Sequence, residues 1–73
     1  MKPIAQVLEE RTPALLAMPG VVGTAEGASG GHPVFVVLIR RDDAELRRRL
    51  PDQVEGYPVE VRVVGEVRPL KTR

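Results

Sequence analysis

The chain lacks cysteine and tryptophan and has a single histidine among its 73 residues. Without cysteine it has no disulfide, no thiol nucleophile and no thiolate ligand for a metal. One histidine is also too few for a histidine-rich zinc site. A chain of this length buries only about 60% of its unfolded surface, so small domains usually need additional support. Of the usual supports, association with another chain and tight internal packing are left.

The net charge is close to zero, and aromatic side chains are few. Eleven basic residues oppose ten acidic ones, and the net charge of +1 creates no general field for nucleic acid or anionic lipid. Only Phe35 and Tyr57 are aromatic, which leaves little to stack on bases. No stretch approaches the roughly 20 apolar residues of a membrane span, and the N-terminal segment is too polar for a signal peptide. We therefore expect a cytoplasmic protein with no membrane contact.

Arginine and proline are abundant instead. Nine of the eleven basic residues are Arg, seven residues are Pro, and asparagine is absent. This composition suits a thermophilic host, although a GC-rich genome produces the same bias.

The strongest signal is an uninterrupted apolar run at residues 34–39. Side chains alternate between the two faces of a strand, and a strand with one wet face alternates apolar with polar residues. A continuous run therefore predicts that both faces are shielded from water, which a short chain has little material to do. One face carries Val34, Val36 and Leu38, and the other carries Phe35, Val37 and Ile39.

Two segments predict helices. Residues 3–17 place apolar side chains at helical spacing, but Pro13 disrupts a helix interior, so a kinked helix and two abutting helices are both open. Asp42 with Glu45 three residues later resembles a capping box. Pro51 ends the short helix that follows.

Strands are predicted at residues 21–27, at the apolar run and at residues 59–63, where Val alternates with charged residues. In the first strand the small residues Gly23, Ala25 and Gly27 share a face, which favours a close approach by the first helix. Residues 28–33 are rich in turn formers and predict a loose hairpin connection. Residues 68–73 are expected to form a flexible tail.

These elements predict a single α+β domain over residues 1–73 with the order α-β-β-α-β. The expected architecture is a three-stranded sheet with two helices on one face, in a ferredoxin-like or split βαβ-like arrangement. The other face is then a bare apolar patch that requires a partner, most simply a second copy in a homodimer. The expected interface is either Val34, Val36, Leu38, Val59, Val61 and Val63 or the opposite face, Phe35, Val37 and Ile39.

The candidate ligand loop contains Gly27, Ser29, Gly30, Gly31 and His32. Its glycines lead into a strand and no Lys-Ser/Thr follows, so a mobile hairpin loop is a simpler interpretation than a phosphate site. Ser29, His32 and nearby Glu26 lack the held geometry of a catalytic triad. We assign no catalytic, cofactor or metal residue. A small-ligand or metal-sensing domain that uses this loop and the turn at residues 20–23 is the second hypothesis.

Arginines cluster around the short helix, at Arg40, Arg41, Arg47, Arg48 and Arg49. Consecutive residues spread around a helix and aromatic partners are scarce, so a solvated surface is favoured over a nucleic-acid site. Weak RNA or DNA binding by these arginines is the third hypothesis. Asp42, Asp43 and Glu45 are explained by helix capping rather than by a metal.

Several short motifs together resemble a known family. They are residues 15–23, which end in Met-Pro-Gly-Val-Val-Gly, then Pro33-Val34-Phe35-Val36-Val37, Leu50-Pro51, Glu55-Gly56-Tyr57-Pro58-Val59 and Gly65. The chain is similar to small bacterial domains of unassigned role that occur alone or on the N-terminal side of trypsin-like serine peptidases. The resemblance covers most of residues 14–67 and implies an accessory or interaction module without catalytic residues. We therefore expect no enzyme activity and no cofactor, and a module that self-associates through its open sheet face.

Overall fold

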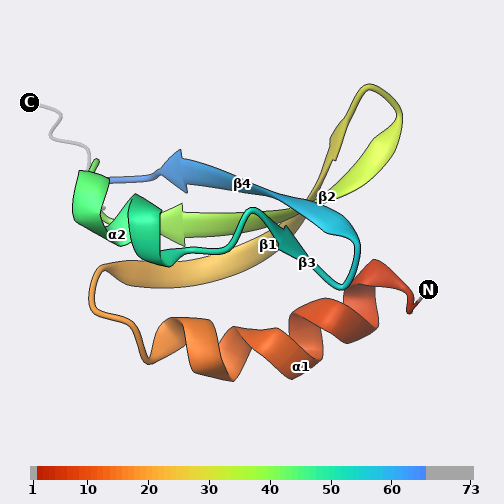
Figure 1. Ribbon diagram of the computed structural model, residues 1–73, viewed down its shortest axis with the longest axis horizontal. Helices are drawn as coiled ribbons and strands as arrows, with labels where there is room; N and C mark the ends of the chain where they lie inside the picture. Colours follow the sequence, from red (N-terminus) through yellow and green to blue (C-terminus); the bar gives the residue numbers. More distant parts are fainter. Residues whose placement is uncertain (1, 66–73) are drawn as a thin grey trace, which may run out of the picture.

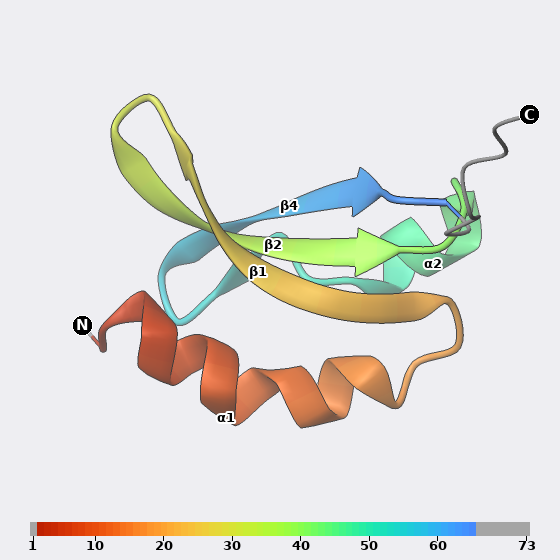
Figure 2. The same ribbon diagram turned by 180° about the vertical axis from the view of Figure 1, so that it is seen from behind.

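The computed structural model describes residues 2–65 (Figures 1 and 2). Its elements in chain order are α1 (Ile4–Leu16), β1 (Val21–Ser29), β2 (His32–Ile39), α2 (Ala44–Arg49), β3 (Gln53–Val54) and β4 (Tyr57–Val63). They form an α+β domain with a mixed sheet of order β1-β2-β4-β3, in which β2 is antiparallel to β1 and parallel to β4. The predicted tail, residues 68–73, lies outside the described residues.

The α+β class and the two helices are confirmed, but the expected number of strands was wrong. The sheet has four strands, because β3 pairs antiparallel with the start of β4. A strand of two residues is too short to show the alternation that identifies strands in a sequence. The ferredoxin-like or split βαβ-like arrangement is not confirmed beyond its parallel β2–β4 pair, whose connection contains α2.

One continuous helix, α1, spans both sides of Pro13, so the alternative of two abutting helices was wrong. Pro13 has no N–H to donate to the carbonyl of Glu9. On the same turn, the hydroxyl of Thr12 donates to the carbonyl of Leu8 and supplies a different hydrogen bond. Packing of the apolar side of α1 against the sheet outweighs the single missing backbone bond.

The hydrophobic core lies between the helices and one face of the sheet, which we call the helix-covered face. From β2 it receives Phe35, Val37 and Ile39, each 0% exposed. The parallel register places Val59, Val61 and Val63 of β4 beside these three residues. The predicted grouping of the β4 valines with the other face of β2 was therefore wrong.

The opposite face of the sheet, the back face, was expected to be bare and is not. Val34 and Val36 are only 5% and 1% exposed, although the helices pack on the other face. A Cβ on Gly27 would lie 2.8 Å from a methyl group of Val36, so the backbone of β1 itself covers this valine. The guanidinium of Arg62 lies 3.8 Å from the same Cβ position, which it reaches from β4 across β2. The chain thus covers most of this face by itself, and Leu38 remains half-buried.

The small residues of β1 face away from α1, contrary to the prediction. The register pairs them with the back-face residues of β2: Gly23 with Leu38, Ala25 with Val36 and Gly27 with Val34. The helix packs on the other face, where the hydroxyl oxygens of Thr12 and Thr24 are 2.7 Å apart. The small size of these β1 residues therefore allows the β1 backbone to lie close to side chains of β2 rather than to a helix.

The β1–β2 hairpin extends beyond the rest of the sheet and curls away from α1 (Figures 1 and 2). Ser29 pairs with His32, so only Gly30 and Gly31 form the turn. Their φ angles of 59° and 82° fit a type I′ turn, which suits the twist of a hairpin and favours glycine at both positions. The loose connection predicted over residues 28–33 was wrong, because the strands continue to the turn on both sides.

Candidate functional site

A groove lies between the outer part of the β1–β2 hairpin and the start of β4, and we call it the hairpin groove. Its volume of about 660 Å³ is within the range of about 300–1,000 Å³ usual for ligand sites. Most of its surface is apolar. It is lined by Ser29, His32, Pro33, Val34, Gly56, Tyr57, Pro58, Val59 and Glu60.

Two prolines explain why β2 and β4 separate at the groove. The first pair of their ladder is Phe35 with Val59. In a parallel ladder the preceding rung needs the N–H groups of Pro33 and Pro58, and proline has no N–H. Without these two hydrogen bonds the strands diverge.

Both proline nitrogens face the groove. The N–H of Val64 donates to the carbonyl of Ile39 at 2.9 Å, so the backbone polar groups of Ile39 point toward β4. Along β2 this direction alternates from one residue to the next, so Pro33, six residues before Ile39, also directs its backbone polar groups toward β4. The N–H of Val59 donates in the opposite direction, at 2.9 Å, to the segment before β3. The neighbouring Pro58 therefore turns its nitrogen toward β2. The proline rings place apolar surface where a regular sheet has donors.

Three residues with polar side chains, Ser29, His32 and Glu60, line the groove together with the apolar residues. Ser29 and His32 are exposed cross-strand neighbours at the tip of the hairpin. Glu60 is the acidic residue among the described lining residues, and its carboxylate accepts a hydrogen bond from Arg62 at 3.1 Å.

The predicted ligand loop is therefore divided between different places. Ser29 and His32 line the groove. Gly30 and Gly31 form the turn beyond it, and Gly27 lies on the back face against Val36.

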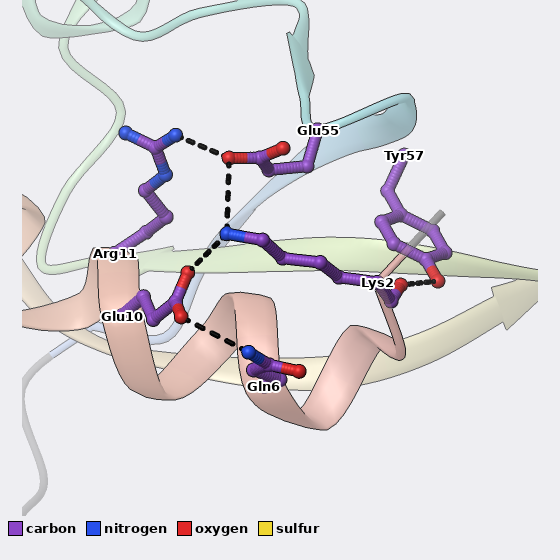
Figure 3. A network of polar contacts seen from close by, with 6 residues as sticks. All are labelled: Lys2, Gln6, Glu10, Arg11, Glu55 and Tyr57. Atoms are coloured by element: carbon purple, nitrogen blue, oxygen red, sulfur yellow. Dashed lines mark hydrogen bonds and ion pairs between the residues drawn. The ribbon is translucent and has the colours of Figure 1, made fainter.

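Polar contacts with α1 hold the wall of the groove at the β3–β4 turn (Figure 3). Tyr57 is 8% exposed, and its hydroxyl donates to the carbonyl of Lys2. Glu55 pairs with Arg11 at 2.5 Å and with Lys2 at 3.8 Å. Lys2 also pairs with Glu10 at 2.7 Å. These contacts join the start of the chain to the turn that carries Tyr57.

The turn that carries Glu55 has positive φ values at both of its central residues. Glu55 has a φ of 51°, the only positive value at a non-glycine residue in the described part of the chain, and Gly56 follows at 85°. The Arg11 hydrogen bond and then the charge of Lys2 lower the pKa of Glu55 below its usual 4.5. The hydrogen bond between Lys2 and Glu10 lowers the pKa of the carboxyl and raises that of the amine. These contacts therefore favour the charged forms of Glu55, Glu10 and Lys2.

The other predicted sites are explained by local contacts. Asp43, and not Asp42, caps α2, because its carboxylate accepts from the N–H of Glu45 at 3.0 Å. Asp42 pairs with Arg47 at 2.9 Å, and Glu45 pairs with Arg49 at 3.4 Å. Two of the clustered arginines thus contact carboxylates. Within residues 2–65, no group of three or more His, Asp or Glu side chains is arranged to hold a metal.

The sequence reasoning identified Ser29 and His32 but missed the β4 wall of the groove. A signal for that wall was present in two X-Pro steps, His32-Pro33 and Tyr57-Pro58, each at the start of a strand. Its meaning depends on the parallel pairing that brings the two steps side by side.

No protein-family model, curated protein or solved structure matches this chain. The resemblance to the domains that accompany serine peptidases therefore stays a prediction. None of the helices within residues 2–65 is long and apolar enough to cross a membrane.

Proposed function

We propose that the protein is a non-enzymatic interaction module that binds a short segment of another protein in the hairpin groove. The observation that carries the proposal is the opening where β2 and β4 part, because it is an apolar hollow with a few polar groups at its edge. Such a combination is typical of binding sites, in which apolar walls give affinity and polar groups give orientation.

The polar groups of the groove favour binding over catalysis. Ser29 and His32 are exposed beside a turn, whereas a nucleophile and its base need a held geometry and an oxyanion site. Glu60 is engaged by Arg62. The groove therefore offers recognition groups at its rim rather than an activated nucleophile.

Self-association through the sheet stays a prediction, but the argument for it from the apolar run is weaker in the structure. It was expected because both faces of the apolar run needed cover, and the chain supplies cover for Val34 and Val36 itself. Light scattering at micromolar concentration measures the oligomeric state directly. A cytoplasmic location and a thermophilic source also stay predictions.

Display of random peptides against the full chain, followed by NMR titration of the ¹⁵N-labelled protein with the selected peptides, tests the proposed function. We expect saturable shifts at the amides of His32, Val34, Gly56 and Glu60, and none along the exposed side of α1. Enriched peptides that shift only other regions, or the absence of any enrichment, would contradict the proposal.

A variant pair adds a control to this experiment. His32→Lys adds a positive charge at the rim of the groove and is expected to weaken binding of the selected peptides. Arg48→Glu makes a larger charge change on the exposed surface of α2, away from the groove, and is expected to leave their binding unchanged.

A further inference from the structure

We infer that the hairpin groove selects a basic side chain, an arginine or lysine of the bound protein segment. The inference rests on the proposed function and adds the chemical class of the ligand. Its basis is the set of hydrogen-bonding groups that the two prolines leave at the groove.

The missing rung leaves backbone acceptors without their strand donors. In a continued ladder the carbonyl of Pro33 accepts from residue 58, and the carbonyl of Gly56 accepts from residue 33. Both donor positions are proline nitrogens, so neither carbonyl has the partner that the register assigns to it. A bound β-strand is a poor complement to these two carbonyls, because its backbone presents as many C=O acceptors as N–H donors. A group that only donates does match it.

Glu60 adds a negative charge on the β4 side of the groove. Arg62 contacts one of its two carboxylate oxygens, at 3.1 Å, and Arg62 is not part of the groove lining. The hydroxyl of Ser29 is a further acceptor on the hairpin side. Guanidinium and ammonium groups donate without accepting, and their hydrogen bonds are roughly twice as strong as those between neutral groups.

The apolar lining suits the stem of such a side chain. Arginine and lysine lay their methylene groups on apolar surface while the charged head stays at polar groups. Here Pro33, Val34 and Pro58 contribute to the mostly apolar lining. A volume of about 660 Å³ holds a basic side chain together with part of the adjoining peptide. An acidic side chain would instead meet Glu60.

The test compares n-butylguanidinium, a basic head on an apolar stem, with the neutral n-butylurea in NMR titrations of the ¹⁵N-labelled full chain. We expect n-butylguanidinium to shift the amides of Val34, Gly56 and Glu60 with saturation and to bind about tenfold more tightly than n-butylurea, because its hydrogen bonds are charge-assisted. Equal affinities overturn the inference. It is also overturned if n-butylguanidinium leaves these amides unshifted while display-selected peptides shift them. Either result leaves the proposed function in place.

Substitutions separate the charge of the groove from its shape. Glu60→Gln removes the charge and is expected to reduce n-butylguanidinium affinity several-fold. Glu26→Gln is the matched control, because Glu26 is an exposed acid of the same hairpin that is not part of the groove lining. Equal affinities of the two variants contradict the role of the charge.

The double variant Pro33→Val with Pro58→Val restores both donors of the missing rung. We expect the two new amides to be protected from hydrogen exchange and n-butylguanidinium binding to be lost, because the new donors occupy the carbonyls of Pro33 and Gly56 that the register assigns to them. Retained binding in a double variant with protected amides overturns the inference. Glu60→Gln keeps it testable if the double variant does not fold.

Discussion

Both faces of β2 are largely shielded from water, although Leu38 on the back face is half-buried, and they are covered by different means. On the helix-covered face, Phe35 and Val37 lie beneath the helices. On the back face, Val36 lies beneath the backbone of β1 at Gly27 and is approached by the guanidinium of Arg62. Helices on one face of the sheet are thus sufficient for a strand that is apolar on both faces. The other face is covered by one neighbouring strand with small residues and by a long side chain from the other neighbouring strand. An apolar run in a short chain does not by itself require a second chain.

Truncation of the core is expected to have the largest effect and to show the difference between the faces. Phe35→Ala should lower the free energy of unfolding by roughly 3–5 kcal/mol, because it leaves a large cavity under the helices. Leu38→Ala on the half-buried part of the back face should cost clearly less. Urea denaturation of both variants measures this, and equal losses would mean that the faces contribute alike.

Gly27→Ala tests the close contact on the back face. The added methyl would lie 2.8 Å from Val36 and 3.1 Å from Val34, so we expect a loss of about 1–3 kcal/mol from overpacking. Gly31→Ala is not a clean control because of its positive φ. Ala28→Ser, an exposed change one residue away, is the suitable control and should be neutral. A stable Gly27→Ala protein would show that β1 does not press on the valines.

Arg62→Ala removes the side chain that reaches over β2 from the other side. The expected loss is below about 1 kcal/mol, since an exposed ion pair contributes little and only the packing of the stem is lost. Arg48→Ala on α2 serves as the control. An unfolding midpoint equal to that of the control would mean that the β1 backbone alone covers Val36.

The pH dependence of the stability is the smallest expected effect, and it concerns the ion pairs within the N-terminal segment and between it and the β3–β4 turn. The folded-state pKa values of Glu10 and Glu55 lie below 4.5, so their contribution is complete above that pH and is lost as the pH falls below it. The raised pKa of Lys2 gives a contribution that is lost only as the pH rises above 10.5. Thermal melts between pH 6 and pH 3 measure the acid side. Glu55→Gln should flatten the decrease, and an unchanged slope would contradict the role of this carboxylate.

The groove was only half visible in the sequence, for a reason that Pro33 and Pro58 illustrate. Each proline alone is consistent with the start of a strand, which is a common place for proline. Together they remove two hydrogen bonds of one rung, but only if β2 and β4 are parallel neighbours in the observed register. The Lys2–Glu55 contact is another case, because it joins residues that are distant in the sequence. The sequence identifies the chemical groups of the groove, but only the fold shows which of them lie side by side.

Local chemistry in the chain determined the amphipathic first helix, the capped second helix, the dry apolar strand and the position of the hairpin, because each depends on residues near one another in sequence. The tertiary structure decided which face of the apolar strand meets the helices and where the small residues of β1 point. It also decided where two prolines open a groove. These depend on strand register, since a shift of one residue exchanges the two faces of a strand, and register is set by contacts between distant parts of the chain.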